Sequence, residues 1–293
     1  MSLEHIAQCP ICHGKSFKQF LVCKDYTTTG ELFHVEQCNN CAMVVTNPRP
    51  GPESANAYYQ SKSYISHTSV ANSVFDHIYL IIRRLTLRWK YGLIKPFLSQ
   101  ARLLDVGCGT GHFLSFCKKQ GAEVYGVEPS PDARAKATAL HIVETLEKLP
   151  EIKFNVITLW HVLEHIYDLE STLEKLKARL ADHGIIFIAV PNWKSFDAAH
   201  YKERWAAYDV PRHVWHFSKD NMKTLIANSG LRLKKITPMK LDSYYVCLLS
   251  ERNRSNGQLS LLKAIKGIMR GYQSNRKAIP EMSYSSLIYL VQK

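Results

Sequence analysis

A glycine-rich turn directly follows a short apolar run in the middle of the chain. Residues 102–106 are typical of a buried strand, and Asp105 stands just before Gly107, Gly109 and Gly111. Glycines there let the chain bend sharply and leave bare main chain for a ligand. The third glycine comes one residue too early for the Gly-x-Gly-x-x-Gly pattern of a dinucleotide site. The carboxylate of Asp105 would repel a diphosphate but attract a sulfonium or ammonium cation.

A second carboxylate, Glu128, ends the next β-rich run, Glu123–Glu128. An acidic side chain at this point of a parallel sheet can accept both hydroxyls of an adenosine ribose. Strand, glycine turn, helix, strand and acidic residue follow one another in that order, which favours a nucleoside-type ligand.

The run His161-Val-Leu-Glu164-His165 matches the inverted zinc-peptidase motif His-x-x-Glu-His. On a helix the two imidazoles would share a face and could reach one metal. The run directly follows an apolar strand, however, and nothing else in the sequence indicates a peptidase. We therefore expect Glu164 and His165 to fix a helix start or to border a substrate.

Aromatic and hydrogen-bonding side chains are frequent after the apolar run 184–190, at Trp193 and in the segment 205–218. These positions lie past the end of a predicted strand, where a substrate pocket is expected. Transfer of a group to oxygen, nitrogen or an activated carbon needs a base to take up a proton. The candidate bases are His161, His213 and His216, and the candidate substrate contacts are Trp193, Asp209 and Arg212, whose guanidinium could hold a phosphate.

The N-terminus holds two Cys-x2-Cys knuckles, made by Cys9 and Cys12 and by Cys38 and Cys41. Four thiolates satisfy tetrahedral zinc and leave no open position, so the sequence predicts a structural zinc module without catalysis. His13 or His34 could replace one sulfur, and four spare thiols are the alternative.

The rest of the chain alternates short apolar runs with amphipathic helices, which predicts a mostly parallel sheet covered on both faces. The expected parts are a zinc-ribbon-like module (1–52), a linker with N-terminal helices (53–97), an α/β domain (98–240 plus 282–293), and a helical lid or insertion (241–281).

Three segments, 103–111, 126–128 and 154–165, resemble successive motifs of class I S-adenosylmethionine-dependent methyltransferases. The resemblance implies a Rossmann-like seven-stranded sheet whose last pair is antiparallel, and S-adenosylmethionine as cofactor. It places Asp105, Gly107 and Gly109 at the methionine part and Glu128 at the ribose. Leu146 would border the adenine, and Trp160 and His161 the methyl group. The predicted cofactor site comprises Asp105, Gly107, Cys108, Gly109, Gly111, Glu128, Leu146 and Trp160.

Composition bounds the function classes. With 46% hydrophobic and 22% charged residues the chain is an ordinary globular protein, not a disordered one. It lacks a signal-peptide pattern and an apolar run long enough to cross a bilayer, so we expect a cytoplasmic protein with reduced thiols. The formal charge of +13 is concentrated in residues 61–100 and 201–293, which favours an anionic partner or a solvated basic surface.

The sequence thus predicts an enzyme that transfers a methyl group to a small-molecule or glycan-type acceptor, such as a nucleotide-linked or lipid-linked sugar. The segment Asp209-x-Pro-Arg-His-x-x-His-Phe-Ser resembles bacterial methyltransferases near sugar pathways. The alternatives are an RNA methyltransferase, disfavoured by the slightly acidic N-terminal module, and a non-catalytic nucleoside-binding scaffold. Residues 259–270 form an amphipathic pattern, interpreted as a lid or packing helix or as a helix lying on an anionic membrane.

Overall fold

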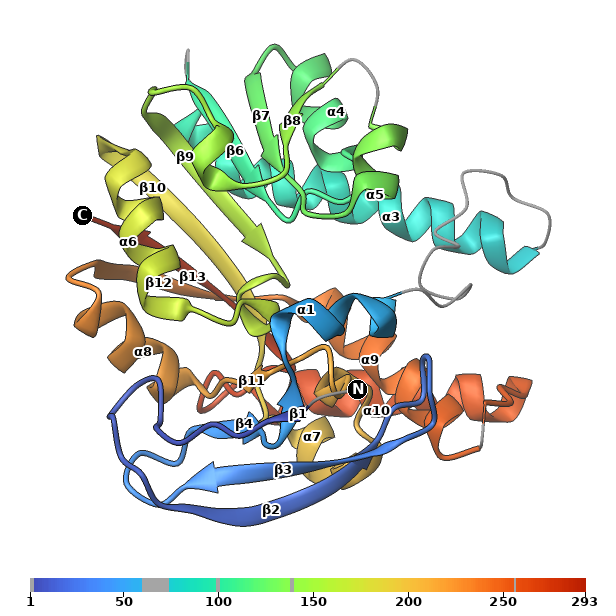
Figure 1. Cartoon of the computed structure of the whole chain (residues 1–293). Coiled ribbons are helices and arrows are strands. Elements are labelled where there is room, and N and C mark those ends of the chain that lie inside the picture. The colour runs from blue at the N-terminus through green and yellow to red at the C-terminus, as the bar shows by residue number, and fades with distance from the viewer. Residues whose placement is uncertain (1–2, 60–73, 99–100, 138–139, 256) are drawn as a thin grey trace.

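The structure, a computed structural model of the 293-residue chain, describes residues 3–59, 74–98, 101–137, 140–255 and 257–293 (Figure 1). Of the predicted linker region 53–97, residues 60–73 lie outside the described residues. A seven-stranded sheet forms the centre, with the order β12-β13-β10-β9-β6-β7-β8. Its strands are β6 (Arg102–Val106), β7 (Glu123–Val127), β8 (His141–Val143), β9 (Phe154–Trp160), β10 (Leu180–Pro191), β12 (Arg232–Pro238) and β13 (Ser286–Gln292).

The pairing within this sheet matches the predicted topology. Strands β6 to β10 pair in parallel, whereas β13 is antiparallel to both β10 and β12. Parallel pairs need crossover connections, and helices supply most of them: α4 (His112–Lys119), α5 (Pro131–Lys136), α6 (Leu169–Arg179) and α8 (Lys219–Asn228). The predicted α/β fold with seven strands is therefore confirmed.

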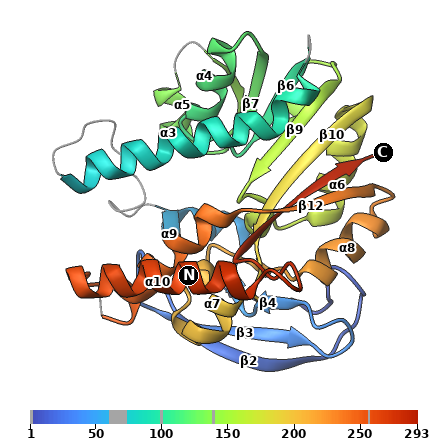
Figure 2. The same cartoon turned by 180° about the vertical axis from the view of Figure 1, so that it is seen from behind.

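Two hydrophobic clusters cover the two faces of the sheet. Neighbouring residues of β6 alternate between them, since Leu103 belongs to one cluster and Leu104 to the other. The first cluster contains buried residues of α4 and the end of α3 (Val74–Ile94), and the second contains leucines of α6 and α8. Figure 2 shows α3 crossing one face of the sheet. This two-sided burial holds the carboxyl ends of the parallel strands along one edge.

The N-terminal module packs against the central domain through a second sheet. Its strands are β2 (Phe17–Lys24), β3 (Leu32–Cys38) and β4 (Val44–Thr46), in the order β11-β4-β3-β2, and a short pair joins β1 (Leu3–Glu4) to β5 (Arg49–Pro50). Strand β11 (Trp215–His216) comes from the α/β domain, so a ladder crosses the predicted boundary. The two parts also contribute buried side chains to the same hydrophobic clusters. The domain boundary at residue 52 therefore stays a prediction.

The predicted insertion before the last strand contains two helices, α9 (Lys240–Asn253) and α10 (Leu261–Lys277), which pack together. They lie beside α7 (Phe196–Tyr201), at the end of the molecule that also holds the N-terminal sheet, while α1 (Pro52–Ala55) follows that sheet along the chain (Figures 1 and 2). Among the described residues, no helix has both the length and the apolar character needed to cross a membrane.

Candidate functional site

The glycine turn between β6 and α4 has left-handed backbone at all three glycines, with φ of 66° at Gly107, 54° at Gly109 and 73° at Gly111. A Cβ at Gly107 would lie 2.5 Å from Val162, and one at Gly111 2.5 Å from Leu140. At Gly109, in contrast, no described atom lies within 4 Å of an added Cβ. Packing therefore requires the outer two glycines, whereas the space beside the middle one is open.

Glu128 lies at the rim of this turn, directly after β7. Its Oε2 accepts a hydrogen bond of 2.8 Å from the backbone N–H of Gly109, and its Oε1 one of 2.9 Å from that of Ser130. The carboxylate is thus held against the open glycine, where parallel sheets bind ligands. Cys108 is buried under the turn, and burial raises the pKa of its thiol.

Asp105 and Lys90 bring opposite charges together below the turn. Asp105 is buried and accepts a 2.6 Å hydrogen bond from the Thr158 hydroxyl. Burial raises the pKa of Asp105 to about 7 and lowers that of Lys90 to about 8, although the carboxylates of Asp105 and Asp242 oppose the latter shift. The Lys90 Nζ lies 4.6 Å from the centre of the Trp160 ring. Lys90 was not among the predicted site residues, because it lies in the region 53–97 that was predicted only as a linker with N-terminal helices.

Trp160 ends β9, at the same edge of the sheet. Its ring packs edge-to-face on Phe113 at 5.7 Å between ring centres. Its buried Nε1 has no hydrogen-bond partner among the described residues. A buried indole N–H is normally paired, so this donor is available to a ligand.

His161 follows with left-handed backbone, φ 58°, which directs it away from the strand. Its Nδ1 lies 3.3 Å from a carboxylate oxygen of Glu164, and its Nε2 lies 3.7 Å from one of Asp242 on α9. Burial lowers the pKa of His161, but the two carboxylates outweigh it and raise that pKa above its ordinary value. Asp242 is a second residue that the sequence analysis missed, since α9 is remote from β9 along the chain.

The peptidase motif is not formed on a helix. Only a short 3-10 turn, Leu163–His165, lies within it, and the Nδ1 of His165 lies 3.0 Å from both the Arg212 carbonyl and the Tyr59 hydroxyl. His161 and His165 therefore do not share a helix face. Glu164, His165 and His213 do place potential ligand atoms within 4.8 Å of one another. The carboxylate of Glu164 also faces the Nδ1 of His161, and this contact helps to raise the pKa of His161.

The structure corrects the predicted role of Arg212. Its side chain is fully buried and bonds to Asp25 at 2.9 Å and to Asp209 at 2.6 Å. Further hydrogen bonds reach the Thr28 hydroxyl and the Tyr58 carbonyl. With its donors engaged by the protein, this guanidinium joins the N-terminal module to the α/β domain and does not hold a substrate phosphate.

The remaining predicted acceptor residues also contact the N-terminal module. The Nε2 of His216 lies 3.0 Å from the Thr46 hydroxyl, and burial holds the pKa of His216 well below its usual value. The Nδ1 of His213 donates to the Ala207 carbonyl at 2.8 Å, which leaves its Nε2 4.0 Å from Glu164. Trp193 is half-buried and packs edge-to-face on Phe20 of β2. Of the three predicted bases, His161 is the one beside Trp160.

Leu146 lies in a 3-10 turn, Leu146–Lys148, after β8, and is partly buried against the core. The turn follows the strand that pairs with β7. Its predicted contact with an adenine stays a prediction.

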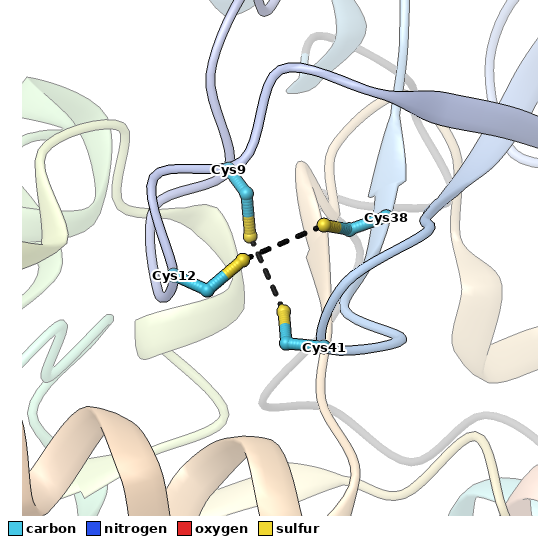
Figure 3. A group of neighbouring side chains, drawn as sticks. All are labelled: Cys9, Cys12, Cys38 and Cys41. Atoms are coloured by element: carbon cyan, nitrogen blue, oxygen red, sulfur yellow. Dashed lines mark hydrogen bonds between the residues drawn. The ribbon is translucent and has the colours of Figure 1, made fainter.

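The four N-terminal cysteines converge on one point (Figure 3). The sulfurs of Cys9 and Cys41 are 3.5 Å apart, those of Cys12 and Cys38 are 3.6 Å apart, and all four lie within 4.8 Å of one another. Tetrahedral zinc with Zn–S bonds of about 2.3 Å needs sulfurs roughly 3.8 Å apart, so this set fits.

The two cysteine knuckles also have the same backbone geometry. His13 and Ala42, each directly after the second cysteine of its knuckle, both have φ of 57°. Each donates its N–H to the carbonyl of the first cysteine, Cys9 or Cys38. The turns thus present all four thiols to the same side without the help of His13 or His34.

The comparisons with known proteins agree with this geometry. The chain belongs to a family of methyltransferase domains, whose model matches residues 76–236. The predicted family is therefore confirmed.

Several curated relatives share this region. A ubiquinone biosynthesis O-methyltransferase of Rhodopseudomonas palustris (strain BisB5) is 32% identical over 136 residues, which are 40% of this chain and 52% of the relative. Another, from Chelativorans sp. (strain BNC1), is 29% identical over 183 residues, 55% of this chain and 68% of the relative. The chain spans about half the length of the first of these relatives.

Among solved structures, a SAM dependent methyltransferase from Archaeoglobus fulgidus has a TM-score of 0.49 at 19% identity. The match covers 72% of this chain and 94% of that one.

Proposed function

We propose that this protein transfers a methyl group from S-adenosylmethionine to a hydroxyl of a small-molecule acceptor. The observation that carries the proposal is the open space beside Gly109, whose N–H is bonded to the Glu128 carboxylate, in the seven-stranded fold of a methyltransferase family. The O-methyltransferase names of the curated relatives support an oxygen acceptor.

The residues of the turn suit this donor. Glu128 offers carboxylate oxygens for the ribose hydroxyls, and Trp160 offers an unpaired N–H. Asp105 and Lys90 would face the charged amino-acid part of the donor. The Asp105 carboxylate would attract its ammonium group, and the Lys90 ammonium would attract its carboxylate. When bound, the donor supplies an electrophilic methyl group on its sulfonium. A diphosphate would meet two carboxylates here, which disfavours a dinucleotide.

His161 is the proposed general base. Glu164 beside Nδ1 favours the tautomer with the proton on that nitrogen, so Nε2 keeps a lone pair for the hydroxyl proton. The carboxylate of Asp242 then stabilises the imidazolium that forms. Glu164 and Asp242 are positioning residues, since they act through His161.

The proposed acceptor is a neutral hydroxyl compound, either of glycan type or an intermediate of the kind that the relatives' names indicate, from ubiquinone biosynthesis. The suggestion of a phosphorylated acceptor loses its main support, because Arg212 is paired inside the protein. The RNA alternative would need phosphate contacts on the N-terminal module, whose residues 1–60 hold slightly more acidic than basic side chains.

We also propose that the four cysteines hold one structural zinc ion per chain, which ties β3 to the N-terminal knuckle. Metal analysis of the purified protein should find about one zinc per chain. Cys38→Ala should remove it, whereas Cys117→Ala, which deletes a buried thiol of the α/β domain, should leave it in place. A metal-free wild-type protein would contradict the zinc site.

The test of the proposed reaction uses a donor labelled on its methyl group and separate pools of phenolic lipids, nucleotide sugars, lipid-linked sugars and RNA. Label should enter a hydroxyl-bearing small molecule, and His161→Asn should slow this at least about a hundredfold without reducing donor binding. Label in RNA alone would support the RNA alternative. Donor binding without transfer to any pool would support a scaffold instead.

A further inference from the structure

Helix α10 carries its large apolar side chains on the outside of the protein. Six such residues are about half exposed or more: Leu261 76%, Leu262 73%, Ile265 46%, Ile268 50%, Met269 56% and Tyr272 52%. The side of the helix that is buried consists of Gly267, Gly271 and Ser274. Helix α10 therefore packs through small residues, and its large apolar side chains face outward.

Close contact with α9 explains this orientation. A Cβ at Gly267 would lie 3.0 Å from Leu248 Cα, and one at Gly271 would lie 2.8 Å from Tyr244 Cα, so the two helix backbones approach through the glycines. The Ser243 hydroxyl donates to the Gly271 carbonyl, and the Ser274 hydroxyl donates 2.7 Å to buried Asp197. These polar contacts fix the rotation of α10, because turning the helix would leave buried groups unpaired. The apolar strip consequently has to face outward.

The charges of α10 are of one sign. Its sequence contains no acidic residue, and its basic residues are Lys263, Lys266, Arg270, Arg276 and Lys277. At about 100° per residue, the six apolar residues occupy an arc of roughly 120°, and four of the basic residues lie on the adjoining arc, between the apolar strip and the buried side. An apolar strip flanked by cations is the arrangement of helices that lie in a membrane interface.

We propose that α10 docks the protein on an anionic lipid surface, with its apolar strip inserted among the headgroups and its basic flank against them. Two copies of the chain pairing through this face would bring two helices without acidic residues together, and their charges would repel. An anionic bilayer instead complements both the strip and the flank. Figure 2 shows α10 running along the outside of the molecule, away from the seven-stranded sheet.

Docking through α10 would also bring the membrane towards the proposed base. Helix α9 lies between α10 and the central domain, and it carries Asp242, whose carboxylate faces His161. A membrane-resident hydroxyl compound is then a suitable acceptor. This last step rests on the proposed methyl transfer, whereas the docking itself does not.

The test is cosedimentation of the full chain with sucrose-loaded vesicles of dioleoylphosphatidylcholine, alone or mixed equally with dioleoylphosphatidylglycerol. Wild type should bind the mixed vesicles and bind the neutral ones much more weakly. The double variant Leu262→Glu/Ile268→Glu should lower binding by at least about tenfold, since it places charge in the strip without touching the buried side. The matched control is Leu32→Glu, which changes a 67% exposed leucine of β3 and should bind as wild type does.

A second arm tests the charges. Lys263→Gln/Lys266→Gln should reduce binding to the mixed vesicles by roughly fivefold per lysine and leave binding to neutral vesicles unchanged. Equal binding of wild type to both vesicles, or none to either, would overturn the proposal. A dimer found in sedimentation velocity would also overturn it, if Leu262→Glu/Ile268→Glu dissociates this dimer while the variant still binds vesicles. Donor affinity, measured without vesicles, separates failure of docking from failure of the proposed reaction.

Discussion

The donor side of the candidate site (Gly109, Glu128 and Trp160) and the loop at residues 205–218 differ in how their polar groups are paired. On the donor side the space beside Gly109 is open and the Trp160 Nε1 lacks a partner among the described residues. In the loop, Arg212 and His216 are buried and bonded to the N-terminal module. The Trp160 N–H thus remains for a ligand, whereas the polar groups of the loop join two parts of the protein.

The largest expected effect is on stability, at Arg212. Replacement by alanine leaves Asp25 and Asp209 buried without their cation, so Arg212→Ala should lower the free energy of unfolding by about 3–5 kcal/mol. Urea denaturation measures this. The control is Arg204→Ala, since Arg204 is half exposed and lies 3.8 Å from Glu203, and it should change stability by less than about 1 kcal/mol. A stable Arg212→Ala protein with a raised KM for its acceptor would restore the phosphate-binding role.

The next effect is on catalysis, at His161. His161→Asn should lower kcat by about a hundredfold to ten-thousandfold, because it removes the proposed base. The raised pKa of His161 means that it is protonated, and inactive as a base, at pH values below that pKa; kcat/KM should therefore rise with pH and reach half its maximum above about 6.5. Glu164→Gln should move this midpoint down.

His216→Asn is the comparison for His161→Asn, since His216 bonds to Thr46 in the N-terminal sheet. It should reduce stability and leave kcat of the folded protein within a few-fold of wild type. A larger loss of kcat in His216→Asn than in His161→Asn would reverse the assignment of the base.

A smaller effect is expected on donor affinity, at Glu128. Glu128→Gln removes the charge that the proposed ribose contact requires and should weaken donor binding about tenfold to hundredfold in titration calorimetry. Glu123→Gln is the matched control, because Glu123 lies on the same strand but is half exposed and pairs with Arg102. Unchanged affinity in Glu128→Gln would contradict the donor site.

The smallest expected effect is a loss of stability at acidic pH, caused by His165. Burial, helped by the nearby His213, lowers the pKa of His165 to about 4. Between about pH 6.5 and 4, His165 therefore binds a proton in the unfolded chain but not in the folded protein. The free energy of unfolding should fall by about 1–3 kcal/mol as the pH falls through this window. Urea denaturation at several pH values measures it, and His165→Asn should flatten the decline. An equal decline in that variant would assign it to other groups.

Much of the donor side could be predicted because its signals are local. The strand, the three glycines and Glu128 follow one another within residues 102–128, and all three glycines have the left-handed backbone that favours glycine. The two cysteine knuckles are equally local, since each turn is closed by hydrogen bonds within a few residues. The turns can therefore be predicted without knowledge of tertiary packing, whereas the convergence of the four thiols depends on it.

The missed features depend on distant parts of the chain. Lys90 and Asp242 reach the site from helices that lie before and after the motifs in sequence, so no spacing announces them. Arg212 was misinterpreted because its partner Asp25 lies in the N-terminal module. The orientation of α10 was set by its glycines and serine, whose contacts with α9 and Asp197 outweigh the burial of its larger side chains.

The ladder between β4 and β11 has a consequence for how this protein can be cut. Trp215 pairs with Val45 and His216 with Val44, so the α/β part supplies the outermost strand of the N-terminal sheet. Expressing residues 53–293 alone would strip that strand of its neighbour and leave the Arg212 guanidinium without Asp25. Chains truncated in this way should therefore aggregate during purification. The amino-terminal fifty residues are thus expected to be needed for the folding of the α/β part.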